Sequence, residues 1–477
     1  MHKDFEEDAV DAAARVLETN WTGRYTVPAT GLYPHQWSWD SAFVAIGTRH
    51  RTPGRARAEL VQLLDAQWPD GRVPQIVYDV GRDDDYAPGA EFWRSGPGVA
   101  GPAAGPARAG PTAGPATSGL VQPPVHAWAA WLVHCADPAG SAREGFLARV
   151  YPRLARWHEY LHGPRAGAVG LPVTKHPWET GTDNSPLWDV ALERVPPEAH
   201  TAIRRPDLRH AGTGERPGSR DYRRYYRLAE AYRDAGCADE VPIGFAMVCP
   251  LFTSVQAVSE LALARMARAL PDDAGGGAPS DVEGDGDGGS GGRSGAAAGA
   301  HETAAERVIA AMDVHLWDDD LGLYVALDDT TGKRVRRATV NGLVPLLLAG
   351  SLATGRSERL LATLTGPGFL GRGPYLPSTS REDPAFDPAL YWRGPAWFNM
   401  SWLLLRAVRA LGRDDLAARL GEHFAVTAPE GFPEYVDPDT GTGRGTRQFS
   451  WTAALTLDAL LSDERELLPT PDVPSGT

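Results

Sequence analysis

The sequence predicts an all-α protein folded as an (α/α)6 barrel, a ring of six helical hairpins that carries long loop insertions. Three observations favour this fold. Segments with helical periodicity follow one another along most of the 477 residues, loops rich in Pro, Gly and Trp separate them, and the alternation typical of strands is scarce. Paired helices bury their apolar faces on neighbouring pairs, and about six pairs close a ring.

The spacing of apolar residues places the individual helices. In residues 5–18, Phe5, Ala9, Ala13 and Val16 share one helical face. The same periodicity predicts helices over residues 40–50, 55–67, 124–136, 143–162, 221–234, 245–268, 302–316, 340–364, 391–411, 413–424 and 449–461. Strand alternation is limited to residues 323–327 and 335–339. An α-solenoid would also consist of helical hairpins, but no repeat of fixed period is visible.

A single domain, residues 1–477, is expected, although a chain of this length often forms two or three. Two stretches are of low complexity: residues 96–118 repeat Gly-Pro and Ala-Gly-Pro, and residues 272–300 are almost entirely Gly, Asp, Ser and Ala. Neither buries enough apolar surface to offset its ordering entropy, so both are predicted to be mobile loops. Because helical patterning resumes after each, they are interpreted as insertions and not as linkers.

The charge balance excludes several classes of partner. The chain has 61 Asp and Glu against 47 Lys and Arg, a net charge of −14. Such a surface repels phosphate backbones and anionic lipids, so neither nucleic acid nor a membrane is expected as a partner, although one local arginine can still hold a small anion. No apolar run approaches the ~18–20 residues of a membrane span, and residues 1–8 do not resemble a signal peptide.

The cysteines also bear on the compartment. Cys135, Cys237 and Cys249 are scattered and lack the spacing of a disulfide or metal framework, which predicts reduced thiols and a cytoplasmic protein. Whether the chain forms a homo-oligomer is left open by the sequence.

Fifteen tryptophans are the unusual feature of the composition. An indole stacks well on the C–H face of a pyranose ring, although core packing is the commoner reason for any single Trp. Residues 33–41 set Trp37 and Trp39 beside Gln36 and Asp40 where a loop enters a helix. An N-cap would explain Asp40 alone, whereas the whole set supplies a stacking face with hydrogen-bond partners for sugar hydroxyls.

Two loop segments present candidate catalytic carboxyl groups. Residues 177–186 hold Glu179 and Asp183 beside Trp178, and residues 431–438 hold Glu434 among aromatic residues. A carboxyl group near an indole and away from water has its charged form disfavoured, as a general acid requires. A solvent-facing turn or cap is the alternative. Glycoside hydrolysis needs two carboxyl groups across one bond, but sequence spacing cannot pair acids so far apart.

Five segments together resemble glycoside hydrolase family 63, in its bacterial mannosylglycerate/glucosylglycerate hydrolase branch. They are residues 33–43, 122–125, 178–188, 391–397 and 434–451, in the order expected for that family. The resemblance implies an (α/α)6 barrel, hydrolysis with inversion at the anomeric carbon, and neither a metal ion nor a cofactor in the chemistry. By motif, Asp183 matches the general acid and Glu434 the general base.

The resemblance also implies the substrate, an α-linked glucosyl or mannosyl unit on a small aglycone such as glycerate. Residues 215–222 resemble the loop that closes over the aglycone, where Arg216 and Tyr222 are candidates to hold a carboxylate, assisted by Tyr391 and Gln448. One of several solvated arginines is the alternative for Arg216. The remaining candidates, most of them at the subsite for the released sugar, are Tyr33, Trp37, Trp39, Asp40, Gln122, Trp178, Trp392 and Trp397.

Some features depart from the family pattern. Ser38 stands where the family often has an aromatic residue, which would reshape the sugar subsite, and the insertion at 96–118 lies near Gln122, where it would change access. Residues 83–85, three aspartates, prompt the idea of a diphosphate site of the terpene-cyclase kind, but they lie in an expected loop and are interpreted as solvated acids.

Two other functions are weighed. A trehalase-like enzyme or an oligosaccharide α-glucosidase would keep both carboxyl groups without needing Arg216 to bind an anion. A non-catalytic carbohydrate-binding protein would keep the tryptophans without needing acids at both 183 and 434.

Overall fold

Six helical segments form an inner ring in the computed structural model, which describes residues 2–79, 81–82, 86–95, 114–209, 212, 214–272, 292–425 and 427–462. Each inner member packs on the next along the chain, and the last packs on the first, so the ring closes. Every residue of α2 is buried, which agrees with a helix surrounded by protein on all sides. The members are α2 (Ser38–Thr48), α5 (His126–Ala136), α10 (Pro250–Ala269), the 3₁₀ helix η6 (Val344–Ser351), α13 (Phe398–Ala410) and α15 (Ser450–Leu461).

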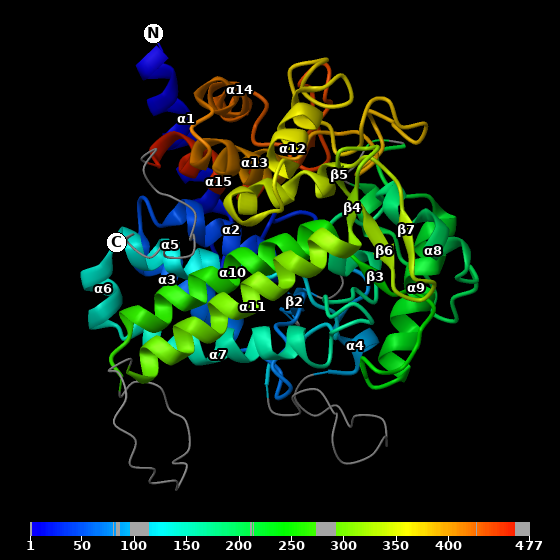
Figure 1. Cartoon of the computed structure of the whole chain (residues 1–477), viewed down its shortest axis with the longest axis horizontal. Coiled ribbons are helices and arrows are strands. Elements are labelled where there is room, and N and C mark those ends of the chain that lie inside the picture. The colour runs from blue at the N-terminus through cyan, green and yellow to red at the C-terminus, as the bar shows by residue number, and fades with distance from the viewer. Residues whose placement is uncertain are drawn as a thin grey trace, which may run out of the picture.

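An outer layer of six helices covers this ring. Outer and inner members alternate along the chain, as a ring of hairpins requires, and Figure 1 shows one such pair, α10 and α11, side by side. The outer helices have one apolar face; α7, for example, buries Val150, Leu154, Trp157 and Leu161. They are α1 (His2–Thr19), α3 (Pro53–Leu64), α7 (Phe146–His162), α11 (Arg293–His315), α12 (Arg356–Thr365) and α14 (Asp414–Ala425). The predicted (α/α)6 barrel is confirmed.

The strands form four small antiparallel sheets between the helices. β1 (Gln36–Trp37) pairs with β2 (Ile76–Val77), β4 (Trp317–Asp318) with β5 (Leu323–Tyr324), and β8 (Tyr435–Val436) with β9 (Gly443–Arg444). The remaining sheet has the order β3 (Met247–Val248), β6 (Ala326–Asp328), β7 (Lys333–Val335). The predicted strand over 323–327 is thus divided between β5 and β6, and that over 335–339 is largely wrong because β7 ends at Val335.

One predicted helix, residues 340–364, is interrupted. It consists of η5 (Val340–Gly342), η6 and then α12, because Leu348 lies outside helical geometry and Leu352 is extended with ψ 158°. The predicted helix over 391–411 begins only at Phe398, since Pro395 and the positive φ of Tyr391 (42°) hold the preceding segment in a loop.

The mobile loops predicted over residues 96–118 and 272–300 are too long, because the C-terminal end of each stretch is ordered. Residues 293–300 belong to α11, where Ala298 is buried against Ala264 and Ala267 of α10. Thr117 and Ser118 are also buried, and Thr117 Oγ1 accepts a hydrogen bond from Trp68 Nε1. Most of each stretch, residues 96–113 and 273–291, lies outside the described residues, as do residues 83–85.

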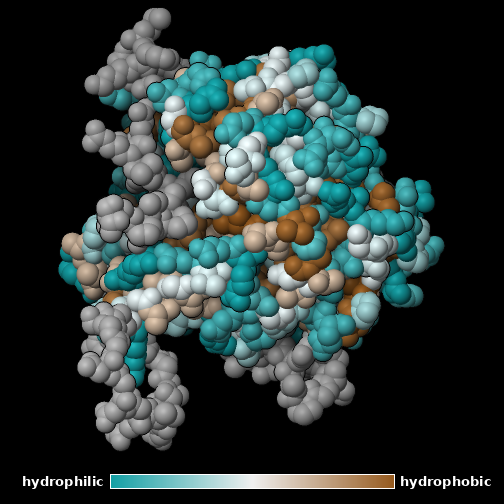
Figure 2. Space-filling model, viewed as in Figure 1, coloured by the Kyte–Doolittle hydropathy of each residue, from teal (hydrophilic) through white to brown (hydrophobic). Residues whose placement is uncertain are grey.

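Most buried apolar side chains form one continuous cluster, which extends in the sequence from Ala29 to Ala459. This continuity supports the expectation of a single domain. The face in Figure 2 is mostly hydrophilic, with apolar residues in small groups. Within the described residues, no helix combines the length and the apolar character needed to cross a membrane.

Candidate active site

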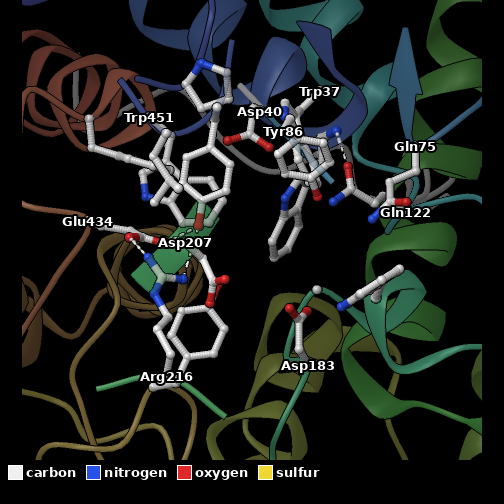
Figure 3. Close-up of a pocket in the computed structure, with 18 of the residues that line it drawn as sticks. Trp37, Asp40, Gln75, Tyr86, Gln122, Asp183, Asp207, Arg216, Glu434 and Trp451 are labelled. Carbon is white, nitrogen blue, oxygen red and sulfur yellow. Dashed lines mark hydrogen bonds and ion pairs between the residues drawn. The ribbon is translucent and has the colours of Figure 1, made fainter. Parts of the chain in front are cut away.

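A pocket opens at the end of the barrel where the inner helices begin (Figure 3). Because inner and outer helices alternate, the inner ones run in the same direction and the loops before them meet at one end. Trp39 and Asp40 lie in the first turn of α2, Gln122 lies just before α5, and Trp397 and Trp451 lie at the starts of α13 and α15. Residues far apart in the sequence therefore share one cavity.

All but one of the predicted site residues line this pocket. They are Tyr33, Trp37, Trp39, Asp40, Gln122, Trp178, Asp183, Arg216, Tyr222, Tyr391, Trp392, Trp397 and Glu434. The exception is Gln448, which is exposed, with a left-handed backbone (φ 53°) and a carbonyl that accepts from Asn20 Nδ2 at 2.8 Å. The turn points the next residue, Phe449, into the pocket instead.

Glu434 is held in a buried network with Arg216 and Tyr33. Arg216 Nη2 lies 2.5 Å from Glu434 Oε2, and Tyr33 donates from its hydroxyl to Glu434 Oε1 at 2.9 Å. Arg216 Nη1 donates to the Tyr33 hydroxyl at 3.0 Å, and its guanidinium stacks 4.4 Å from the Tyr391 ring centre. Both charged side chains are 2% exposed. An ion pair with Arg216 favours the carboxylate form of Glu434, which is the form that a general base requires.

Asp183 lies on the opposite wall of the pocket from Glu434 (Figure 3). Burial raises the pKa of its carboxyl group to about 7, although the positive charge of Arg216 works in the other direction. A carboxyl group that stays protonated near neutral pH is suited to donate a proton. The two acids therefore have contrasting environments: desolvation raises the pKa of Asp183, whereas Glu434 is ion-paired with Arg216.

Hydrogen bonds from two aromatic side chains fix the backbone of the loop that carries Asp183. Trp188 Nε1 donates to the Thr182 carbonyl at 2.8 Å, and Tyr225 donates from its hydroxyl to the Asp183 carbonyl at 3.0 Å. Gly181 has a φ of 72°, and a Cβ there would lie 2.4 Å from the Trp39 ring. Only glycine fits this close approach without a shift.

Glu179, the other acid of this loop, has a structural role. It is 0% exposed, and both its oxygens lie 2.6 Å from guanidinium nitrogens of Arg165. It also accepts from the backbone N–H groups of Val121 and Lys175. Its oxygens are therefore fully engaged within the protein, and it does not line the pocket.

The aromatic wall is built from stacked rings. Trp392 and Trp397 are parallel within 4° at 3.9 Å, and Tyr435 stacks on Trp397 at 4.5 Å. Trp397 is thus enclosed between two other rings, and both tryptophans line the pocket although each is only 2% exposed. The backbone N–H of Trp392 donates to Asn184 Oδ1 at 2.9 Å, which ties this wall to the loop of Asp183.

The polar side chains expected at the sugar subsite meet near the start of α2. Gln122 Oε1 accepts from the Trp39 backbone N–H at 3.2 Å, and burial raises the pKa of Asp40 well above its ordinary value. Ser38, which was expected to reshape that subsite, does not itself line the pocket: it is fully buried, with its Oγ 2.9 Å from His126 Nε2.

Several lining residues escaped the sequence analysis. Phe449 and Trp451 stand in a recognised segment but were given no role, whereas Gln75, Tyr86 and Asp207 carry no local signal. Asp207 accepts from the Tyr222 hydroxyl at 3.0 Å, and Arg205 covers the Tyr222 ring at 3.4 Å. Tyr222 is therefore fixed by neighbours that only the fold brings to it.

Comparisons with known proteins agree with this geometry. A family model described as the mannosylglycerate hydrolase MGH1-like glycoside hydrolase domain matches residues 33–452. The mannosylglycerate hydrolase of Rubrobacter radiotolerans is 37% identical over 95% of this chain and 97% of its own length. The glucosylglycerate hydrolase of Mycolicibacterium hassiacum is 34% identical, over 94% and 96%.

Solved structures show the same relation. The family 63 mannosylglycerate hydrolase of Thermus thermophilus, crystallised in complex with Tris and D-glycerate, superposes with a TM-score of 0.80 at 34% identity, covering 94% of this chain and 99% of that one. The neutral trehalase Nth1 of Saccharomyces cerevisiae, at a TM-score of 0.52 and 15% identity over 91% of this chain and 73% of that one, shares the fold alone.

Proposed function

Because the chain belongs to the mannosylglycerate hydrolase MGH1-like glycoside hydrolases, we propose that it hydrolyses an α-linked glucosyl or mannosyl glycerate with inversion. The observation that carries the proposal is the pair Asp183 and Glu434, which lie on opposite walls of one pocket in contrasting environments.

The two acids divide the chemistry between them. Protonated Asp183 gives its proton to the glycosidic oxygen as the bond to the anomeric carbon breaks. Ionised Glu434 accepts a proton from a water that attacks this carbon from the opposite face. Inverting enzymes leave room for that water, with carboxyl groups about 6.5–9.5 Å apart.

The released sugar would bind among Trp392, Asp40 and Gln122. Trp392 lines the pocket and would stack on a pyranose ring, and the two polar side chains line the same space and would bind hydroxyl groups.

Arg216 is our candidate for the aglycone carboxylate. Its terminal nitrogens already serve Glu434 and Tyr33, but its buried Nε has no hydrogen-bond partner among the described residues. A carboxylate oxygen would satisfy this donor. Tyr222 and Tyr391 flank the same region of the pocket, although the Tyr222 hydroxyl already donates to Asp207.

Proton NMR of purified enzyme with glucosylglycerate and with mannosylglycerate tests the reaction. We expect the first sugar released from the α-linked substrate to carry the β-anomeric signal. Release of α-sugar would contradict inversion. If the enzyme cleaves trehalose or short α-glucosides but neither glycerate compound, our substrate is wrong. The enzyme is then trehalase-like or an oligosaccharide α-glucosidase.

Substitution of the two acids tests their assignment. Asp183→Asn and Glu434→Gln should each lower kcat at least ~10²-fold, the usual scale of lost acid–base catalysis, with circular dichroism unchanged. Glu193→Gln, which removes an exposed carboxyl group on α8 (Asp189–Glu193), is the matched control and should keep normal turnover. Normal turnover of either pocket variant would remove that residue from the mechanism.

Arg216→Ala tests whether Arg216 serves only as the ion-pair partner of Glu434 or also binds the carboxylate of the aglycone. Loss of the ion pair should lower kcat on every substrate, because Glu434 then lacks its charged partner. Loss of the carboxylate contact should additionally raise KM for glycerate glycosides and not for an uncharged α-glucoside. An equal change in KM for both classes would show that Arg216 serves Glu434 alone.

We also propose that the enzyme works in the cytoplasm. Cys237 and Cys249 are buried thiols, which suits a reducing compartment.

A further inference from the structure

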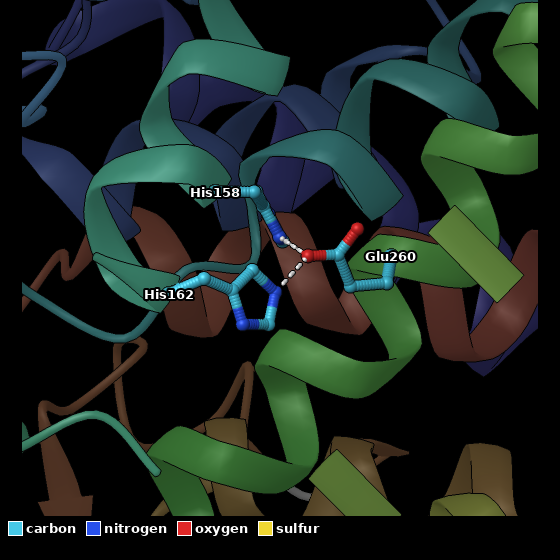
Figure 4. Close-up of side chains that lie close together, drawn as sticks. All are labelled: His158, His162 and Glu260. Atoms are coloured by element: carbon cyan, nitrogen blue, oxygen red, sulfur yellow. Dashed lines mark hydrogen bonds and ion pairs between the residues drawn. The ribbon is translucent and has the colours of Figure 1, made fainter. Parts of the chain in front are cut away.

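Three histidines surround one buried carboxylate on a part of the barrel outside the active-site pocket, and Figure 4 shows two of them, His158 and His162, beside Glu260. Glu260, in the middle of α10, is 1% exposed. Its Oε1 lies 2.8 Å from His158 Nδ1 and 2.6 Å from His162 Nε2, both on α7. Its Oε2 lies 2.7 Å from Nδ1 of His301 on α11. The cluster therefore joins two outer helices to the inner helix between them.

The arrangement has the features of a metal-binding set. His158 and His162 are four residues apart, one helical turn, so both rings leave α7 on the same face. One nitrogen from each ring and one Glu260 oxygen lie within 4.8 Å of one another. Two imidazoles and a carboxylate are ligands for divalent transition ions, in contrast to the all-oxygen sets that Ca²⁺ and Mg²⁺ prefer.

The surroundings of these side chains also suit a cation. The side chains of His158 and Glu260 are 2% and 1% exposed, so an imidazole and a carboxylate meet away from bulk water. A divalent cation held there would compensate the buried carboxylate. The side chain of His162 is 30% exposed and provides a path from solvent.

We propose that His158, His162 and Glu260 bind one divalent transition-metal ion of the Zn²⁺ class, which ties α7 to α10. Zn–N and Zn–O distances of ~2.0–2.2 Å place ligand atoms roughly 3.3 Å apart in tetrahedral geometry, so the three side chains separate by about half an ångström on binding. Water completes the shell on the exposed side of His162. His301 keeps its hydrogen bond to the second Glu260 oxygen and orients the carboxylate from outside.

Tyr151 extends this outer layer. Its hydroxyl lies 3.2 Å from His301 Nε2, so the ring that orients Glu260 is itself held by a residue of α7. A metal ion at this position would therefore stabilise the packing of three helices and leave the sugar pocket unchanged. Its effect belongs to stability and not to turnover.

The test is titration of the full-length protein with ZnCl₂ after dialysis against a chelator. Calorimetry should show one saturable equivalent, the melting temperature should rise with added Zn²⁺, and Co²⁺ should give the visible absorption of a bound, low-symmetry ion. His162→Gln, at the exposed edge of the cluster, should abolish all three signals. His301→Asn keeps every ligand and should weaken binding about 10–100-fold.

A matched control is His315→Gln, which removes a histidine near the end of α11 outside the cluster and should bind as the unmodified protein does. Absence of a saturable equivalent in the unmodified, folded protein would overturn the proposal. Binding that is equally tight in His162→Gln would also overturn it, because the ion would then lie elsewhere. A folded His162→Gln with no binding, beside normal binding by His315→Gln, would establish the site.

Discussion

At the scale of single residues, the carboxyl group of Asp183 sets the pH range of the proposed reaction. Burial raises its pKa to about 7, so the proton that the leaving group needs is lost as the pH rises through this value. We therefore expect kcat/KM, which reports groups of the free enzyme, to be highest on the acid side of neutrality and to fall above about pH 7. The pH profile of kcat/KM measures this, and a profile that is flat from pH 6 to 8 would contradict Asp183 as the acid.

The same pKa predicts how Asp183 affects stability. Its folded-state pKa lies above the ordinary 3.8, so between about pH 4 and 7 the folded chain binds a proton that the unfolded chain has lost. Stability from this residue therefore falls as the pH rises through that window. Asp183→Asn removes the effect, so its gain in melting temperature over the unmodified protein should grow from pH 5 to pH 8.

Glu434→Gln is the contrast for this measurement. It leaves Arg216 buried without its anionic partner, so it should lower the melting temperature at pH 8. Stabilisation by Glu434→Gln, or a gain for Asp183→Asn that shrinks toward pH 8, would mean that the two environments are not as different as the structure shows.

Motifs pointed to the two candidate acids because both stand in local segments of unusual composition. They could not show what holds each acid, because those partners come from distant parts of the chain. Arg216 was expected to contact the substrate, yet it also lies 2.5 Å from Glu434, 218 positions away. Gln448 was misplaced for a related reason: whether a loop residue faces the cavity depends on the backbone turn beside it, as the positive φ of Gln448 illustrates.

At the scale of elements, the segment from Pro177 to Trp188 carries both a structural acid, Glu179, and the proposed general acid, Asp183. Glu179 fixes the segment to Arg165 and to two backbone N–H groups, and Asp183 is then presented to the pocket. Glu179→Ala would leave buried Arg165 with Asp239 as an anionic partner, but it would deprive the backbone N–H groups of Val121 and Lys175 of their acceptor, so we expect the free energy of unfolding to fall by about 1–3 kcal/mol. Chemical denaturation measures this loss. A change below about 1 kcal/mol would show that the pair does not anchor the segment.

Helix boundaries were predictable where apolar periodicity was strong and unpredictable where composition misled. Residues 293–300 resemble a flexible tract, yet alanine has the highest helix propensity, and Ala298 finds a partner surface on α10. Residues 344–351 are apolar enough for a long α-helix, yet they form a 3₁₀ segment that ends at an extended Leu352. Periodicity reports which residues are buried and not which helical geometry the packing selects.

At the scale of the whole molecule, a closed ring could be predicted from the number of hairpins and the family resemblance, but the contacts that close it could not. The seam joins α15, the last inner helix, to α2, the first, and α1 packs over it. No sequence spacing relates these helices. The seam also sets the pocket, since Trp39 at the start of α2 meets Trp451 at the start of α15 with ring centres 5.2 Å apart.

Gly47 is the residue on which this closure depends most directly. A Cβ at this position of α2 would lie 2.0 Å from the backbone oxygen of Ala454 in α15, so the two helices touch backbone to backbone. Gly47→Ala must push the first and last inner helices apart. We expect a loss of about 1–3 kcal/mol in the free energy of unfolding, although alanine favours a helix by up to about 1 kcal/mol over glycine.

Gly54→Ala on α3 is the control that isolates the seam from helix propensity. Its Cβ would meet no atom closer than 3.6 Å, so this variant should be as stable as the unmodified protein or slightly more so. Urea denaturation of both variants, with kcat measured alongside, gives the comparison. Because Trp39 and Trp451 meet across the same seam, Gly47→Ala should also lower kcat. Equal stability of the two variants would show that the ring tolerates separation at this point, and that its closure rests on the outer contacts of α1.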